Sequence, residues 1–115
     1  MYSRGLTAKK GDGNDFSFTE DRRMGTSYFF TMRGRVTMSE ASHVEYILNK
    51  ALGAGCTYLV INMCFVKIFT SAGIRVILAT YKKLRRIGGT LKIENPSETV
   101  RNVIGMTALD ELLMK

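Results

Sequence analysis

A run of β-forming apolar residues in the middle of the chain constrains the fold more than any other feature. It covers Thr57–Met63 almost without interruption. The wider apolar stretch Tyr58–Phe69 has 12 residues and contains Asn62 and Lys67. A membrane-spanning helix needs roughly 20 apolar residues, so this stretch is too short to span. A short run of this kind is typical of a central strand buried on both faces. We therefore expect a sheet-based core, with Cys64–Thr70 as a loop after this strand.

Further strand patterns lie on both sides of this run. Aromatic and polar side chains alternate in Asp15–Thr19, and a second strand pattern covers Tyr28–Arg33. The polar residues around Arg22–Thr26 predict a longish turn, so these two strands form a hairpin. Leu91–Glu94 predicts a last strand near the end of the chain.

Three helix patterns complete the chain. Thr37 and Glu40 fit a capping box, after which apolar residues recur at helical spacing. A second amphipathic pattern begins near Ser71 and continues to about Arg86. The segment Asn95–Glu98 has an Asn cap, Pro at the first helical position and Glu at the third, which predicts the start of a third helix.

The resulting order is β-β-α-β-α-β-α, which predicts one α/β domain over residues 15–115. We expect a mixed β-sheet of four or more strands packed with three main helices. Right-handed crossovers place the strands that begin near Thr57 and Leu91 side by side. Residues 1–14 have almost no apolar content, so they predict a flexible tail without a secretory signal. The expected core includes Leu59, Ile61, Ile77 and Leu84.

The chain has a strong positive charge. Its net charge is +7 and its pI is about 9.7, which favours nucleic acid, an anionic membrane or an acidic protein as partner, or else a solvated basic surface. The basic residues gather on the second helix and near the hairpin: Arg75, Lys82, Lys83, Arg85 and Arg86, and Arg22, Arg23, Arg33 and Arg35. Nucleic-acid binding would need exposed aromatic side chains among them. We assign Tyr28–Phe30 to the core and the sheet face instead, and expect no insertion into a membrane.

The two cysteines indicate a reducing compartment. If Cys56 and Cys64 lie along one extended strand, roughly 26 Å separates them, far beyond the reach of a disulfide. We expect two free, buried thiols and a cytoplasmic protein. His43 is the single histidine and is expected at the surface, so no metal site is predicted.

No pattern of catalytic residues stands out. The close acidic pairs are Glu20 with Asp21, in a predicted turn, and Asp110 with Glu111, near the C-terminus. Both pairs are typical of solvated surface, and no glycine-rich phosphate loop opens a helix. We therefore expect a binding module that is not an enzyme and needs no cofactor.

The segment Lys67–Gly73 holds the most informative polar residues. Thr70 and Ser71 follow a buried strand and stand at the entrance to a helix. A hydroxyl there is an ordinary N-cap. Unpaired N–H groups and the helix dipole also favour negative charge at this place, so a phosphate on Ser71 would be tolerated.

In this context the chain resembles the STAS domain of bacterial anti-sigma-factor antagonists, over roughly residues 15 to 115. Family members have an apolar strand, a loop ending in Asp-Ser-Ser/Ala-Gly-Leu, an amphipathic helix, a Gly-Gly turn, a strand and a last helix. The matching segments are Gly34–Thr37, Leu59–Ile61, Val66–Ile74, Gly88–Gly89 and Thr107–Leu109.

The resemblance implies a partner-switching module. Its serine, matched by Ser71, is phosphorylated by an anti-sigma factor that is a GHKL-type serine kinase, and a phosphatase reverses the reaction. The unphosphorylated form binds that factor and so releases the sigma factor. The implied partner-binding residues are Lys67, Thr70, Ser71, Ala72, Gly73 and Arg75, with Thr70 as a minor phosphorylation site.

Three positions that carry an acidic residue in the family carry a neutral one here: Thr37, Asn62 and Thr70. The last of these removes an acid next to the phosphoacceptor and can alter kinase recognition. Two alternatives therefore stay open. One is a STAS scaffold without phosphorylation, in a stress-signalling or lipid-transport complex. The other is a basic nucleic-acid-binding domain.

Overall fold

The computed structural model describes residues 7–9 and 15–106 and contains one sheet with three helices. The sheet has five strands in the order β1-β2-β3-β4-β5. The strands are β1 (Thr7–Lys9), β2 (Ser17–Met24), β3 (Ser27–Val36), β4 (Tyr58–Phe69) and β5 (Thr90–Glu94). The helices are α1 (Met38–Gly53), α2 (Ser71–Arg86) and α3 (Glu98–Met106).

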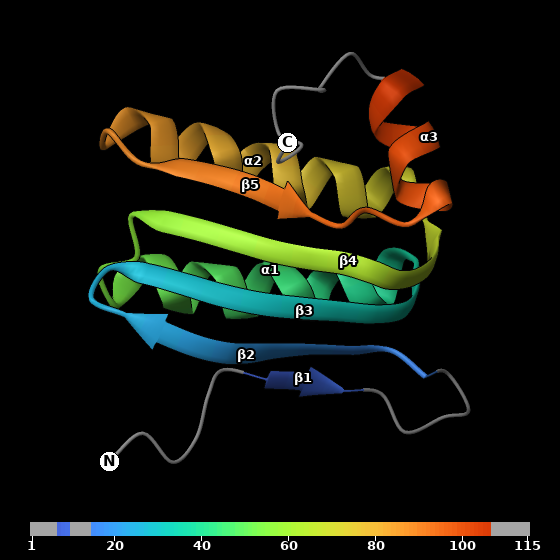
Figure 1. Ribbon diagram of the computed structural model, residues 1–115, viewed down its shortest axis with the longest axis horizontal. Helices are drawn as coiled ribbons and strands as arrows, with labels where there is room; N and C mark the ends of the chain where they lie inside the picture. The colour runs from blue at the N-terminus through green and yellow to red at the C-terminus, as the bar shows by residue number, and fades with distance from the viewer. Residues whose placement is uncertain (1–6, 10–14, 107–115) are drawn as a thin grey trace.

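The sheet is mixed, as the sequence predicts. β1, β2 and β3 are antiparallel neighbours, whereas β3, β4 and β5 run parallel to one another. The register pairs Leu59 of β4 with Leu91 of β5, which confirms the predicted neighbours. Figure 1 looks onto the sheet with α1 and α2 behind it, and α3 stands at the end where β4 and β5 finish. The predicted order and the α/β class are confirmed.

The core lies between the sheet and helices α1 and α2. The four predicted core residues, Leu59, Ile61, Ile77 and Leu84, are all at most 1% exposed. The aromatic rings of Phe18 on β2 and Phe30 on β3 stack with centroids 4.7 Å apart, which joins the hairpin to this core. No helix in the described part of the chain is long and apolar enough to cross a membrane.

The hairpin and the segment before it differ from the prediction. β2 continues to Met24, so Gly25 and Thr26 form a tight turn in place of the expected longish one. Gly25 has φ 62, a left-handed conformation that other residues seldom adopt. β1 lies within the predicted tail, because its residues Thr7–Lys9 pair with Ser17–Thr19 of β2. A segment with few apolar side chains can form this strand because backbone hydrogen bonds to β2 hold it in the sheet.

The central strand is longer than expected, and this corrects the predicted loop at Cys64–Thr70. β4 stays paired with β3 as far as Phe69. An irregularity in the register interrupts the pairing after Thr31 of β3. Nearby, the Asn62 side-chain carbonyl accepts the Cys64 N–H at 3.0 Å. Asn62, one of the family's acidic positions, therefore stabilises the backbone of the strand here.

The helix starts are partly as predicted. The Glu40 carboxylate accepts the Thr37 N–H at 3.1 Å, which is the backward half of a capping box. The third helix begins later than expected, because Ser97 replaces Asn95 as its cap and accepts the Val100 N–H at 3.3 Å. Asn95 has φ 48 and belongs to the turn before the helix. The Thr107–Leu109 motif lies outside the described residues.

Candidate functional site at the start of helix α2

The predicted loop residues meet at a direct junction between β4 and α2. β4 ends at Phe69, Thr70 is the N-cap in an extended conformation, and Ser71 is the first residue of the helix. This confirms the predicted position of Ser71 at a helix N-terminus. The junction stands at the end of the sheet where β3 also finishes, because Val36 pairs with Phe69.

The Thr70 side chain is engaged inside the domain. Its hydroxyl donates to the Val36 carbonyl at 3.0 Å, and its backbone N–H donates to the same oxygen at 3.3 Å. The hydroxyl therefore ties the last residue of β3 to the first turn of α2 and does not cap the helix in the usual way. A kinase would have to break this bond before it could use Thr70.

Ser71 has the opposite environment. The residue is exposed, and its hydroxyl makes no hydrogen bond with another described residue. The first intrahelical bond runs from the Ile74 N–H to the Thr70 carbonyl at 3.1 Å, so the N–H groups of the preceding turn point outward without an intrahelical acceptor. The first turn contains no acidic residue. This end of α2 therefore favours an added negative charge close to Ser71.

Gly73 allows the helix to approach the strand closely. A Cβ atom built there would lie 2.7 Å from Cε1 of the Phe69 ring and 3.3 Å from a Val36 methyl group. Both of these neighbours are buried, so neither can move away freely. The glycine of the motif thus sets the packing of α2 on β4 and positions Ser71 at the surface.

Two basic residues flank the junction in different ways. Lys67 donates to Asp15 Oδ2 at 2.6 Å, and both side chains are largely exposed. This hydrogen bond, together with the Lys67 charge, lowers the pKa of Asp15. Arg75 is exposed one turn into α2. Arg75 therefore adds a positive charge to the first turns of α2, whereas the Lys67 charge is partly offset by Asp15.

Next to Ser71, a groove of about 310 Å³ runs between the first turns of α1 and α2. It is lined by Met38, Ala41, Ser42, Glu45, Ala72, Arg75, Val76 and Ala79. Met38 is 76% exposed, which is unusual for a large apolar side chain. The α1 side of this groove is not predicted from the sequence. The signal that could have revealed it is an apolar residue at the first position of a capped helix, outside the apolar stripe.

Comparison with known proteins identifies the fold family. The model of the STAS domain family matches residues 19–115 of the chain. The chain belongs to the STAS domain family. No curated protein matches it in sequence.

Solved structures with the same fold agree with this assignment of a STAS domain. The anti-sigma factor antagonist SpoIIAA in its unphosphorylated form superimposes with a TM-score of 0.77 at 20% identity, covering 84% of this chain and 85% of that one. The Bacillus cell fate determinant SpoIIAA in the phosphorylated form gives a TM-score of 0.72 at 18% identity, over 84% and 88%. An anti-sigma factor antagonist from Mycobacterium paratuberculosis gives 0.73 at 20% identity, over 92% and 87%. At these identities the likeness concerns the fold.

The two thiols of this STAS domain differ, which corrects the expectation that both are buried. Cys56 is fully buried, and this burial raises the pKa of its thiol to about 11. Cys64 is exposed, because the strand irregularity turns it outward. It lines a shallow hollow of about 470 Å³ together with Asp15, Arg33, Phe65, Val66 and Lys67. No group of three or more His, Cys, Asp or Glu side chains suited to a metal occurs among the described residues.

The hairpin arginines bind aromatic rings of the STAS domain itself. Arg22 lies over the ring of Phe29 at 4.1 Å, and Arg33 lies over that of Phe65 at 4.2 Å. Tyr28 and Phe30 are buried in the core, as the sequence predicts. Arginine therefore occupies one face of the Phe29 ring and of the Phe65 ring, and the core covers Tyr28 and Phe30. Of these rings only Phe65, at 49% exposed, keeps substantial accessible surface, so they offer no row of free stacking platforms for bases.

Proposed function

We propose that this STAS domain is an anti-sigma-factor antagonist that is switched off by phosphorylation of Ser71. The observation that carries the proposal is the contrast between the two hydroxyls at the junction. The Thr70 hydroxyl donates to the Val36 carbonyl, whereas the Ser71 hydroxyl is exposed at the first position of α2 and makes no hydrogen bond with a described residue. The same fold occurs in SpoIIAA, which was solved both unphosphorylated and phosphorylated.

The partner in this proposal is an anti-sigma factor that is also a GHKL-type serine kinase, and a phosphatase resets the switch. The kinase would contact Thr70–Gly73 and the flanking cations Lys67 and Arg75, and reach into the groove beside Met38. In this proposal the protein acts in the cytoplasm, because its kinase partner also binds a sigma factor there. Residues 15–115 would act as one domain.

The switch works through charge. A phosphoserine adds about −1.5 to −2 charges. The outward N–H groups at the start of α2 stabilise that charge within the folded domain. A partner surface that fits the neutral Ser71 would instead have to bury an anion, which costs several kcal/mol unless the anion is paired. Phosphorylation would therefore release the kinase without unfolding the antagonist.

The test combines the protein with its cognate kinase-type anti-sigma factor and ATP, and analyses the products by mass spectrometry. We expect phosphate on Ser71 and at most a minor amount on Thr70. Ser71→Ala should still bind the kinase, because the hydroxyl contributes little contact area. Ser71→Asp should bind at least about tenfold more weakly, which corresponds to about 1.4 kcal/mol.

Asn49→Asp is the matched control, because Asn49 is exposed near the C-terminal end of α1 and the substitution adds one negative charge at the end of the domain opposite Ser71. It should bind like the native protein. Phosphate found only outside Thr70 and Ser71 would rule out the switch, as would equal binding by Ser71→Asp and the native protein. A kinase that binds but never phosphorylates would favour the scaffold alternative.

A further inference from the structure

Two turns of the domain share a sequence pattern that the switch does not use. Arg22-Arg23-Met24 ends β2 and Gly25 begins the turn to β3, whereas Arg85-Arg86 ends α2 and Ile87-Gly88 leads toward β5. In each turn an apolar side chain follows two arginines and precedes a glycine. Met24 and Ile87 are each 60% exposed. Both turns therefore present a large apolar side chain next to positive charge.

The two turns lie at the same end of the molecule. The Thr57 N–H donates to the Thr26 carbonyl at 2.9 Å, and the Thr90 N–H donates to the Thr57 carbonyl at 3.0 Å. These bonds align the starts of β3, β4 and β5. Because neighbouring strands are about 4.8 Å apart, the starts of β3 and β5 are separated by about 10 Å. Figure 1 shows both turns at the left end of the domain, away from α3.

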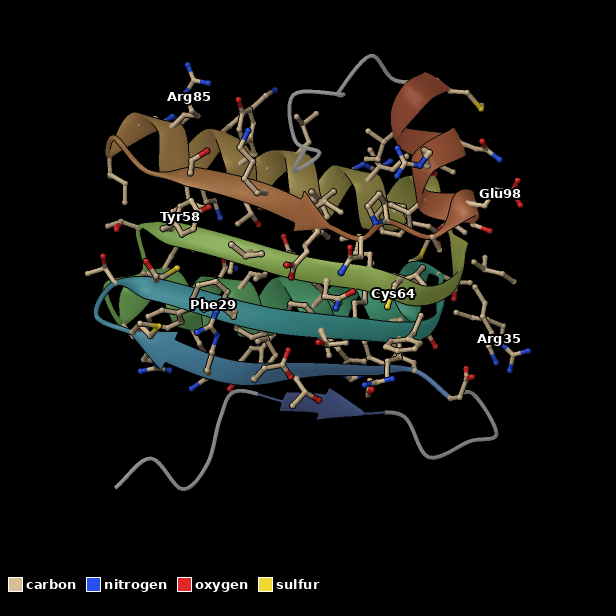
Figure 2. The ribbon with its side chains drawn as sticks, viewed as in Figure 1. Phe29, Arg35, Tyr58, Cys64, Arg85 and Glu98 are labelled. Atoms are coloured by element: carbon tan, nitrogen blue, oxygen red, sulfur yellow. The ribbon has the colours of Figure 1, made fainter. Side chains whose placement is uncertain are left out.

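This end, called here the basic end, carries six exposed cations: Arg22, Lys50, Lys82, Lys83, Arg85 and Arg86. In the described part of the chain, none of them is ion-paired. Lys83 donates to the Asn49 amide oxygen and Arg85 to the Tyr81 hydroxyl, both neutral acceptors. Figure 2 shows Arg85 at this end, projecting outward from α2.

Among the described residues, the nearby carboxylates form no ion pair with these cations. Glu20 is buried and bonded to Arg23 at 2.7 Å. The Asp21 carboxylate accepts the Thr31 hydroxyl at 2.5 Å on the sheet. Basic residues near a helix C-terminus also stabilise the helix itself. However, α1 also ends at the basic end and has only Lys50 in its last turn, whereas the last turn of α2 has three basic residues. The cluster on α2 is therefore larger than stabilisation of a helix C-terminus requires.

We propose that the basic end binds the surface of a membrane containing anionic phospholipids, as a peripheral contact. Met24 and Ile87 enter the interface between headgroups and acyl chains, and the cations contact the lipid phosphates. Exposed apolar tips beside cations that have no ion-pair partner in the described part of the chain carry the proposal, because an anionic bilayer offers partners for both. Nucleic acid fits less well, since aliphatic tips cannot stack on bases and Phe29 is already covered by Arg22.

The proposed contact is compatible with the Ser71 switch and does not depend on it. Ser71 lies at the opposite end of the sheet, beyond the last residue of β4, whereas the basic end adjoins the first. A domain bound through the basic end therefore leaves Ser71 and its groove accessible. The contact would concentrate the protein at a membrane without any spanning segment.

The test is vesicle flotation of the full chain. One set of vesicles contains phosphatidylcholine alone, and the other contains equal parts of phosphatidylcholine and phosphatidylglycerol. We expect binding to the anionic vesicles and weakening by salt. Lys82→Glu/Arg86→Glu should weaken binding at least about tenfold, because each basic residue near the surface contributes substantially. Ile87→Ser, which keeps every charge, should weaken it about fivefold.

Arg35→Glu/Arg101→Glu is the matched control, since it makes the same charge change with exposed residues away from the basic end, near the end of β3 and on α3. It should bind anionic vesicles within about twofold of the native protein, and thermal unfolding should show that all variants are folded. Equal loss in the control and the basic-end variant would overturn the proposal. So would no binding to anionic vesicles, unchanged binding by Ile87→Ser, or tighter binding to single-stranded DNA than to vesicles.

Discussion

At the scale of single residues, two similar side chains have different properties because of their positions. Cys56 precedes β4 and lies in the core, where burial favours the neutral thiol over the thiolate. Cys64 lies in the same stretch of chain, yet it faces solvent where Asn62 accepts its backbone N–H. Whether a thiol here can react therefore depends on its exposure. The hydrogen bond between the Cys64 N–H and Asn62 helps to set that exposure.

We expect a thiol reagent to modify Cys64 rapidly and Cys56 only after unfolding. The pKa of Cys56 rises from 9.0 to about 11 on folding. This shift stabilises the fold below pH 9 and its contribution is lost as the pH rises toward about 11, because the unfolded chain then releases the proton first. The loss is at most about 3 kcal/mol. Mass spectrometry after timed labelling, and urea unfolding of the native protein and Cys56→Ala across this pH range, measure both effects. Equal labelling rates for the two thiols would contradict the assignment.

At the scale of secondary-structure elements, the junction between β4 and α2 is held by contacts to β3. Thr70 donates twice to the Val36 carbonyl, and Gly73 lets the helix rest on the Phe69 ring. These contacts replace the loop that the sequence predicts before the helix. They give Ser71 a defined position, because the residue before it is fixed to the neighbouring strand.

Thr70→Val tests this junction. The substitution keeps the shape of the side chain and removes the hydroxyl, while the backbone N–H still bonds to the Val36 carbonyl. We expect the free energy of unfolding to fall by about 1 kcal/mol. Thr70→Ser keeps the donor and should lose less than about 0.5 kcal/mol. Urea titration of the three proteins measures the difference, and equal stability of Thr70→Val and the native protein would show that the hydroxyl bond contributes nothing.

At the scale of the whole molecule, the sheet separates two ends with different chemistry. The end where β3 and β4 finish carries Ser71 and the groove between α1 and α2. The end where the parallel strands begin carries the two Arg-Arg turns. Helices α1 and α2 both run from the first end to the second, because each follows a parallel strand. One core between the sheet and these helices joins the two ends.

That shared core should dominate the stability of the domain. Leu59 on β4 and Ile77 on α2 are at most 1% exposed. Truncating either to Ala should lower the free energy of unfolding by about 2–5 kcal/mol, a large share of the roughly 5–15 kcal/mol typical of a domain. Ile87→Ala, on an exposed turn, should change it by less than about 0.5 kcal/mol. Losses below about 1 kcal/mol for both core variants would mean that the strand and helix faces are misassigned.

The sequence alone was enough for the order of elements from β2 onward, the parallel pairing of β4 with β5, the core residues and the place of Ser71 at a helix start. Periodicity and capping residues are encoded by residues close together in the chain. The handedness of crossovers follows a general rule. The extension of β4 to Phe69, the exposure of Cys64 and the bond from Thr70 to Val36 depend on β3. So does the joining of two Arg-Arg turns at one end of the sheet. These features required the tertiary structure, because hydrogen bonds between strands distant in the chain have no signature in the spacing of residues along it.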